Sequence, residues 1–137
     1  MFIKDNKEIE NIKKCNVNDG ITMTKAIYHI KDAIKNKEKL SKYDIKLIVD
    51  EYRRKVGKSE YLASSFDTIV AYKENSAIYH YLPSNKNSKV VKSNALLLID
   101  SGGNYLGGTT DITPTISLYK DKIPNIIKNI IHLCFFL

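Results

Sequence analysis

Two aspartates frame a glycine-rich segment of the chain, Asp100-Ser-Gly-Gly-Asn-Tyr-Leu-Gly-Gly-Thr-Thr-Asp111. The run 95–99 before it is apolar, and β-branched residues alternate over 109–118, so the sequence predicts two strands joined by a glycine-rich turn. Asp100 and Asp111 are at mirror positions about a reversal at 105–106, which predicts that they pair across the strands on one face. Two carboxylates this close repel each other unless a cation or a proton lies between them. The segment therefore indicates a divalent-metal site.

Two other interpretations of this segment use the same residues. An ordinary exposed hairpin would place both aspartates in water, but Asp100 follows a run of large aliphatic residues and is expected at the end of a buried strand. An unpaired charge is costly there. A phosphate cradle would use the glycine pairs 102–103 and 107–108, but no lysine follows the glycines, so the P-loop pattern fails.

The composition is basic without indicating a nucleic-acid partner. The 137 residues are enough for one domain or part of one, and the formal net charge is +7. Only two of the 22 basic residues, Arg53 and Arg54, are arginines, and the lysines are spread along the chain. Bidentate recognition of bases and phosphates favours arginine. Nucleic-acid binding is therefore not expected from charge alone.

Cysteine usage and hydropathy favour a cytoplasmic protein. Cys15 and Cys134 fit no zinc or redox spacing, so we expect both to be reduced thiols. The N-terminus becomes charged at once, unlike a signal peptide. The apolar segment 123–137 contains Pro124 and Lys128 and is too short for a membrane span. We expect no membrane partner.

The first sixty residues predict two amphipathic helices. Asp5 and Glu8 have the spacing of a capping box, and an apolar stripe continues to about Lys35. A second box at Ser41 and Asp44 opens a shorter helix, for which Gly57 is the predicted C-cap. The remaining elements are strands, predicted at 66–72 and 77–82 with a turn at 73–76, followed by an exposed loop at 84–94 and the aspartate hairpin. The predicted fold class is α+β.

Four segments, in this order and spacing, resemble the Xaa-Pro aminopeptidase (aminopeptidase P) family: Ser65-Phe-Asp-Thr-Ile-Val-Ala-Tyr, His80-Tyr81, Leu97-Leu-Ile-Asp-Ser-Gly-Gly and Gly108-Thr-Thr-Asp-Ile-Thr. The resemblance covers about residues 5–118 and leaves the tail 119–137 unassigned. It implies that residues 1–137 are a partial metallopeptidase catalytic domain, the first half of a pita-bread fold. In that fold two related halves of helices and antiparallel strands enclose a dinuclear metal centre, usually manganese.

The resemblance also implies roles for three residues. Asp100 corresponds to the first metal ligand, Asp111 to the carboxylate that bridges both ions, and His80 to the histidine that assists the scissile peptide. The implied activity is manganese-dependent release of the N-terminal residue that precedes proline in a peptide. Hard oxygen ligands suit manganese, and two ions can share and deprotonate one water.

The family's second half supplies three further ligands, a histidine and two glutamates, which this sequence lacks. No glutamate follows Glu74, and the only later histidine, His132, is in the apolar tail. Pro114 also replaces the family's usual arginine and removes a strand hydrogen-bond donor. We therefore expect a truncated form whose site a second polypeptide or a second copy completes. The alternative is a non-catalytic pita-bread-like interaction module, with nucleic acid as its electrostatic partner.

Overall fold

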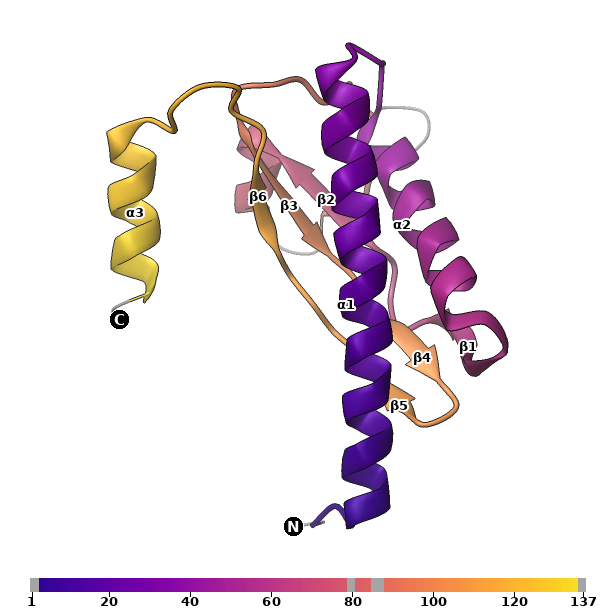
Figure 1. Cartoon of the computed structure of the whole chain (residues 1–137). Helices are drawn as coiled ribbons and strands as arrows, with labels where there is room; N and C mark the ends of the chain where they lie inside the picture. The colour runs from indigo at the N-terminus through magenta and orange to yellow at the C-terminus, as the bar shows by residue number, and fades with distance from the viewer. Residues whose placement is uncertain (1–2, 79–80, 85–87, 136–137) are drawn as a thin grey trace.

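Two long helices cover one side of the strands, and a third helix follows at the C-terminal end (Figure 1). The computed structural model describes residues 3–78, 81–84 and 88–135. In chain order the elements are α1 (Asn6–Lys35), α2 (Lys42–Gly57), the 3₁₀ helix η1 (Lys58–Glu60), β1 (Tyr61–Ser64), β2 (Ile69–Tyr72), the 3₁₀ helix η2 (Lys73–Ala77), β3 (Leu96–Asp100), β4 (Gly103–Tyr105), β5 (Gly108–Thr109), β6 (Thr115–Ser117) and α3 (Asn125–Phe135). The predicted α+β class is confirmed.

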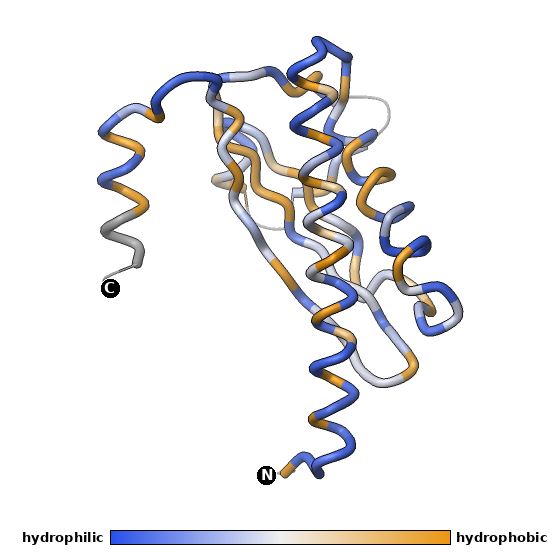
Figure 2. The backbone as a smooth tube through the Cα atoms, in the orientation of Figure 1, coloured by the Kyte–Doolittle hydropathy of each residue, from blue (hydrophilic) through white to orange (hydrophobic). Residues whose placement is uncertain are grey.

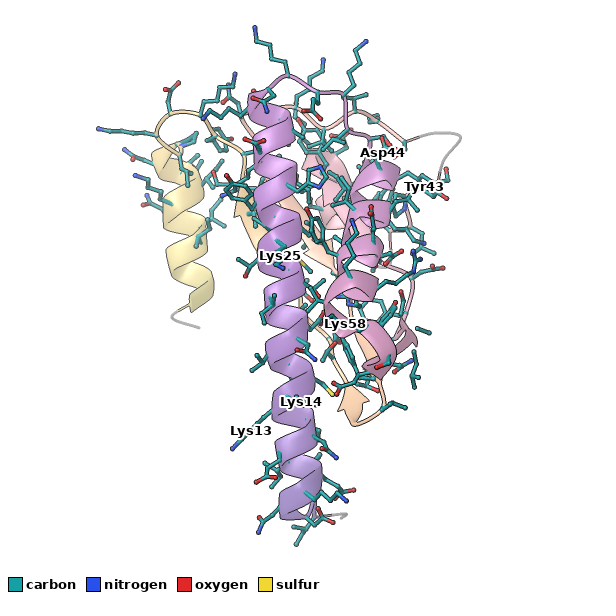
Figure 3. All side chains as sticks on the ribbon, turned by 45° about the vertical axis from the view of Figure 1, so that its right-hand side comes forward. Lys13, Lys14, Lys25, Tyr43, Asp44 and Lys58 are labelled. Atoms are coloured by element: carbon teal, nitrogen blue, oxygen red, sulfur yellow. The ribbon has the colours of Figure 1, made fainter. Side chains whose placement is uncertain are left out.

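Both long helices begin at the predicted capping boxes. The Asp5 carboxylate accepts a hydrogen bond from the Glu8 backbone at 2.8 Å, the Glu8 carboxylate accepts one from the Asp5 backbone at 2.8 Å, and a second complete box precedes α2. Each box satisfies backbone donors that a helix start leaves unpaired. The N-terminal end of α1, before the turns that carry Lys13 and Lys14, extends past the other elements (Figure 3).

The predicted C-cap at Gly57 is wrong. Gly57 is the last residue of α2, and the positive φ, of 48°, belongs to Lys58. A Cβ on Gly57 would lie 2.5 Å from Cβ of Tyr61, so a glycine is needed here for close packing of α2 against β1. A glycine is required at position 57, but the reason is steric contact with Tyr61 and not a left-handed backbone.

The strands form two antiparallel sheets that share one long hairpin. The sheet orders are β2-β3-β6 and β1-β4-β5. The pairs Leu98 with Thr115 and Asn104 with Thr109 belong to the same register, so β3 and β4 form one arm of the hairpin, and β5 and β6 form the other. The Ile99 backbone donates to the Pro114 carbonyl at 3.0 Å, and proline cannot donate back. The loss of a ladder donor at Pro114 is confirmed, and it lies where the second arm is interrupted.

The hydrophobic core lies between the β2-β3-β6 sheet and the two long helices. Val70, Leu97 and Ile99 are fully buried on the inner face of the sheet, where they meet Ile30 of α1 and Ile45 of α2. Figure 2 shows this apolar stretch on the strands that α1 crosses. Along β3, buried and half-buried positions alternate, so the outer face of the sheet is directed away from the helices.

Two predictions between β2 and β3 fail. The predicted strand 77–82 is not formed in the part that the structure describes: η2 ends at Ala77, and the described residues Ile78, Tyr81 and Leu82 belong to no strand. The predicted exposed loop 84–94 contains a buried residue, Val91, whose N–H donates to the Leu40 carbonyl at 2.8 Å. An isolated bridge between Ser41 and Val90 fixes the same segment to the start of α2. The alternation of apolar residues predicted a strand at 77–82. A strand also needs a neighbouring strand to pair with, and alternation does not predict whether one is present.

The tail 119–137, to which the resemblance assigns no structure, contains α3. Its residues Ile126 and Ile130 are 70% and 54% exposed, and Figure 1 shows the helix standing apart from α1 and α2. Within the described ranges, no helix is both long and apolar enough to cross a membrane.

Candidate metal site

Asp100 ends β3 on the outer face of the sheet. Its neighbours Ile99 and Ser101 are fully buried toward the helices, so alternation directs the half-buried Asp100 to the other side. There its carboxylate accepts a hydrogen bond from the Thr113 hydroxyl at 2.9 Å. Thr113 thus fixes one oxygen of the predicted ligand. The two long helices α1 and α2 lie on the opposite side of this sheet (Figure 1).

The predicted direct pairing of Asp100 with Asp111 is wrong. Ser101 pairs with Ile112, so the register places Thr113 opposite Asp100 and Gly102 opposite Asp111. The reversal is at 106–107, one residue later than predicted, because buried Tyr105 pairs with Gly108. Asp100 and exposed Asp111 are therefore diagonal neighbours on one face, and diagonal positions are about 7–8 Å apart at Cα. That spacing leaves room for a cation between two carboxylates.

A pocket of about 280 Å³ adjoins Asp100 on the outer face. Its floor is made by the sheet residues Ile69, Ala71 and Leu98, and η2 and Ile78 form one wall. Asp100 and Thr113 form the polar edge. A carboxylate beside an apolar hollow is the arrangement expected of a small-ligand site.

His80, the predicted catalytic residue, lies outside the described residues. The segment around it is nevertheless attached to α2. The Lys42 ammonium donates to Oδ1 of Asn75 at 2.8 Å and to the Tyr81 hydroxyl, and it lies 4.3 Å from the centroid of the Tyr81 ring. Lys42 is 1% exposed in the first turn of α2, the turn that also carries Tyr43 and Asp44, which Figure 3 labels. Sequence reasoning missed Lys42, because one lysine among twenty carries no signal.

A buried polar network lies on the inner face of the hairpin, opposite the aspartates. Nε and Nη2 of Arg53 lie 2.8 Å and 2.7 Å from Oδ1 of Asp19. Nη2 of Arg53 also donates to the Ser101 hydroxyl at 3.0 Å, and the Thr110 hydroxyl donates to Oδ2 of Asp19 at 2.6 Å. All four side chains are at most 2% exposed. The network joins α1, α2 and both arms of the hairpin.

Sequence reasoning missed this network, although a signal for it exists. Asp19 lies on the buried face of α1 between Cys15 and Met23, and Arg53 follows Val49 by one turn on the buried face of α2. A charged residue on the apolar face of a helix needs a partner of opposite charge. One residue of each sign on two adjacent helices therefore predicts a buried ion pair.

The two predicted ligands are carboxylates, the donor type expected for a hard metal ion. Asp100 and Asp111 supply hard carboxylate oxygens, which suit manganese. Within the described ranges, no group of three His, Cys, Asp or Glu side chains lies close enough to hold a metal ion. Two carboxylates leave most positions of an octahedral ion to other donors.

Comparison with known families decides the assignment. The model of metallopeptidase family M24 matches residues 10–134, which include most of α1, all of α2, both sheets and most of the C-terminal tail. The chain belongs to the M24 metallopeptidase family. The matched range includes the segment 100–111 with both predicted metal ligands, Asp100 and Asp111.

This chain covers only a small part of the relatives that it matches. A probable Xaa-Pro aminopeptidase P from Sordaria macrospora is 35% identical over 115 residues, which are 83% of this chain and 18% of the relative. A probable Xaa-Pro aminopeptidase P from Arthroderma gypseum is 36% identical over the same length and shares. The chain thus spans about a fifth of the length of these relatives.

Solved structures show the same fold. An X-prolyl aminopeptidase from Caenorhabditis elegans, described as a cytosolic enzyme with a dinuclear active site, superposes with a TM-score of 0.81 at 24% identity over 91% of this chain and 20% of its own. An X-Pro aminopeptidase from Thermotoga maritima matches with a TM-score of 0.75 at 26% identity over 93% of this chain and 32% of its own. The pita-bread fold predicted from the resemblance is confirmed for the part that this chain contains.

Proposed function

We propose that this chain supplies the first two metal ligands of a manganese-dependent Xaa-Pro aminopeptidase site. Asp100 and Asp111, called here the ligand aspartates, would hold the metal, and a second polypeptide or a second copy would add the histidine and two glutamates. The observation that carries the proposal is the register, which sets both aspartates diagonally on the outer face, with Asp100 at the edge of a pocket. M24 membership supports it.

The residues of this chain would each do part of the work. Bound manganese supplies Lewis-acid activation of a water for attack on the peptide carbonyl. Thr113 holds one oxygen of Asp100, so the other is free to bind. The apolar floor of the pocket, formed by Ile69, Ala71 and Leu98, suits the ring of a proline-containing peptide. His80, by resemblance, would stabilise charge or move a proton at the scissile bond.

Titration of the 137-residue chain with Mn²⁺, followed by calorimetry, tests the ligand assignment. The wild type should bind one or more ions weakly, because two carboxylates leave the coordination incomplete. Asp111→Asn should abolish that binding while the melting temperature stays unchanged. Asp121→Asn, which removes an exposed carboxylate in the segment after β6, is the matched control and should bind as the wild type does. Equal affinity in Asp111→Asn and Asp121→Asn would refute the assignment.

Catalysis requires the missing ligands and is tested by completing the domain. The chain is co-expressed with the second half of the catalytic domain of an Xaa-Pro aminopeptidase P, and release of the N-terminal residue from an Xaa-Pro peptide is measured with Mn²⁺. Activity that disappears with Asp100→Asn would show that the two halves form one site. Co-purification without activity would leave a non-catalytic module. A cytosolic location belongs to this proposal and is supported by the description of the C. elegans relative.

One observation favours the alternative of a non-catalytic interaction module that binds polyanions. Two adjoining pockets near the C-terminal end of α1 are lined by lysines, and both include Lys120. Glu38 is the acidic residue among their lining residues. The other lysines are Lys31, Lys35, Lys37, Lys39 and Lys92. Lysines gathered in this way attract phosphates without reading sequence. RNA binding that weakens steeply with salt would support this function, and absence of binding at low salt would exclude it.

A further inference from the structure

We infer that the buried pair Asp19–Arg53 positions the ligand aspartates by gripping the residue next to each of them. Ser101 directly follows one ligand aspartate, and Thr110 directly precedes the other. Arg53 holds the first neighbour and Asp19 holds the second. The inference rests on the proposed function, because it assigns a role to residues that do not touch the metal. Asp19 and Arg53 are positioning residues in this scheme.

The hydrogen bonds give each arm of the hairpin its own anchor. The guanidinium Nη2 of Arg53 donates to Ser101 at 3.0 Å, which fixes the arm formed by β3 and β4. The Thr110 hydroxyl donates to Asp19 at 2.6 Å, which fixes the arm formed by β5 and β6. Because Asp19 and Arg53 are themselves 2.7 Å apart, the two anchors are joined below the hairpin. The ion pair thereby adds a side-chain connection between two arms that the Ser101–Ile112 backbone hydrogen bonds already join.

Strand geometry transfers this anchoring to the opposite face. Successive side chains of a strand point to opposite faces, so a residue held on the inner face directs its neighbour outward. Ser101 and Thr110 are 0% and 2% exposed, whereas Asp100 is half-buried and Asp111 is exposed on the outer side. A twist of either arm would therefore move the inner residue, Ser101 or Thr110, together with the ligand aspartate next to it. Such outer contacts orient metal ligands in known metal sites.

The glycine pair of the hairpin makes room for this arrangement. A Cβ on Gly103 would lie 2.8 Å from Cδ of Arg53, so a side chain there would push the guanidinium stem away. The Gly103 backbone also donates to the Thr110 hydroxyl at 3.0 Å. A Cβ on Gly102 would lie 2.0 Å from the Thr110 carbonyl oxygen. The two glycines thus allow both arms to close over the ion pair.

Stability alone is a weak explanation for the pair. Replacing a buried ion pair by well-packed apolar residues is often neutral or stabilising, and in some proteins such a pair specifies geometry. Apart from their contact with each other, Arg53 and Asp19 form hydrogen bonds with Ser101 and Thr110 of the aspartate hairpin. The contacts are thus directed at the segment whose geometry the proposed metal site requires.

The test compares Thr110→Val and Thr110→Ser in the full chain, with Mn²⁺ as the probe. Thr110→Val removes the hydroxyl with little change in shape and should weaken Mn²⁺ binding by about tenfold or more. Thr110→Ser keeps the hydroxyl and should restore the affinity. The matched control is Thr22→Val, because the buried Thr22 hydroxyl has no hydrogen-bond partner among the described residues. Equal affinities for all three variants, at equal folded fraction by circular dichroism, would overturn the inference.

A second readout separates this inference from the metal assignment. Ser101 and Ile112 exchange backbone hydrogen bonds of 3.1 Å and 3.0 Å across the hairpin, so the exchange rates of their amides report its opening without metal. Thr110→Val should accelerate both amides relative to Leu97 in the core, and Thr22→Val should not. If the wild type binds no Mn²⁺ but the hairpin amides respond, the proposed function fails and the positioning role stands. Unchanged exchange in Thr110→Val would overturn the positioning role even if Mn²⁺ binds.

Discussion

Arg53 and Asp19 form a fully buried ion pair, with Nη2 of Arg53 2.7 Å from Oδ1 of Asp19. The two residues are 34 positions apart and belong to different helices, so the pair closes the α1–α2 unit at the level of the aspartate hairpin. It connects the helical layer, which builds the core, to the strands that bear the proposed metal ligands. Stability and site geometry therefore depend on the same contact.

Removing one partner of this pair should be strongly destabilising. Arg53→Met leaves the Asp19 carboxylate buried without its counter-ion, and the free energy of unfolding should fall by about 3–5 kcal/mol. Urea denaturation measures the change. The control is Glu51→Gln, which breaks an exposed i, i+4 pair with Lys55 and should leave the midpoint unchanged. Equal midpoints for Arg53→Met and Glu51→Gln would contradict the burial of the ion pair.

Two glycines should respond oppositely to the same substitution. Gly20 lies inside α1, and a Cβ added there would have no neighbouring atom within 4 Å, so Gly20→Ala should stabilise by about 0.5–1 kcal/mol through helix propensity. Gly103→Ala should destabilise by about 1–3 kcal/mol, because the new methyl would meet Arg53 and the Tyr105 ring at 2.8 Å. Thermal melts of both variants test this. Destabilisation by both substitutions would show that the contact at Gly103 is not the cause.

Local signals predicted the helices and the main hairpin strand well. The capping boxes at Asp5 and Ser41 are contained within four residues each, and both helices start there. The strand before Asp100 is also where its apolar run indicated. The resemblance carried the fold class, because ordered motifs specify an architecture that composition cannot. Each of these inferences depends on residues close together in the sequence or on a known pattern.

The failures come from contacts that are distant in the sequence. The register of the aspartate hairpin depends on Tyr105, which packs edge-on against Tyr61, and on Leu106, whose N–H donates to the Glu60 carbonyl at 2.9 Å. The segment after β2 leaves the sheet toward the buried ammonium of Lys42. Sequence spacing predicts neither the contacts of the hairpin turn with Glu60 and Tyr61 nor the contact of the segment after β2 with Lys42. A one-residue change in the turn is enough to convert a direct pair of aspartates into a diagonal one.

Tyr105 should make the protein sensitive to alkaline pH. Burial is the main cause that raises the pKa of Tyr105 from 10.0 to about 12, the Asp19 carboxylate adds to it, and the Arg53 guanidinium opposes it. The unfolded chain loses the phenolic proton near pH 10, but the folded chain does not. The contribution of Tyr105 to the free energy of unfolding, at most about 3 kcal/mol, is therefore complete below pH 10 and is lost as the pH rises to about 12.

Tyr105→Phe isolates this effect from the titration of the lysines. The Tyr105 hydroxyl has no hydrogen-bond partner within the described ranges, so phenylalanine should be tolerated at pH 7. Between pH 9.5 and 11.5 the variant should lose less stability than the wild type in urea titrations. Parallel losses in the two proteins would show that the hydroxyl ionises freely in the folded state.

Lys42 should control the segment that leads to and from His80. Its buried ammonium holds Oδ1 of Asn75 and the Tyr81 hydroxyl, and Lys42→Met keeps the length of the side chain but removes both hydrogen bonds and the contact with the Tyr81 ring. The free energy of unfolding should fall by about 1–3 kcal/mol, and the effect should be local, because the groups left unpaired lie on one segment. Amide exchange at Ile78, whose N–H donates to the Asn75 carbonyl at 3.1 Å, should accelerate.

The control for Lys42→Met is Lys46→Met one turn later in α2. Lys46 pairs with the exposed carboxylate of Asp67 at 2.7 Å, so its loss removes a charge from the same helix without touching the segment 75–81. Exchange at Ile78 should be unchanged in Lys46→Met. If the second half of the domain restores peptidase activity, Lys42→Met should lower kcat more than Lys46→Met does, because it frees Asn75 and Tyr81, which flank the predicted catalytic residue His80 in the sequence. Equal exchange rates at Ile78 in the two variants would mean that Lys42 does not anchor the segment.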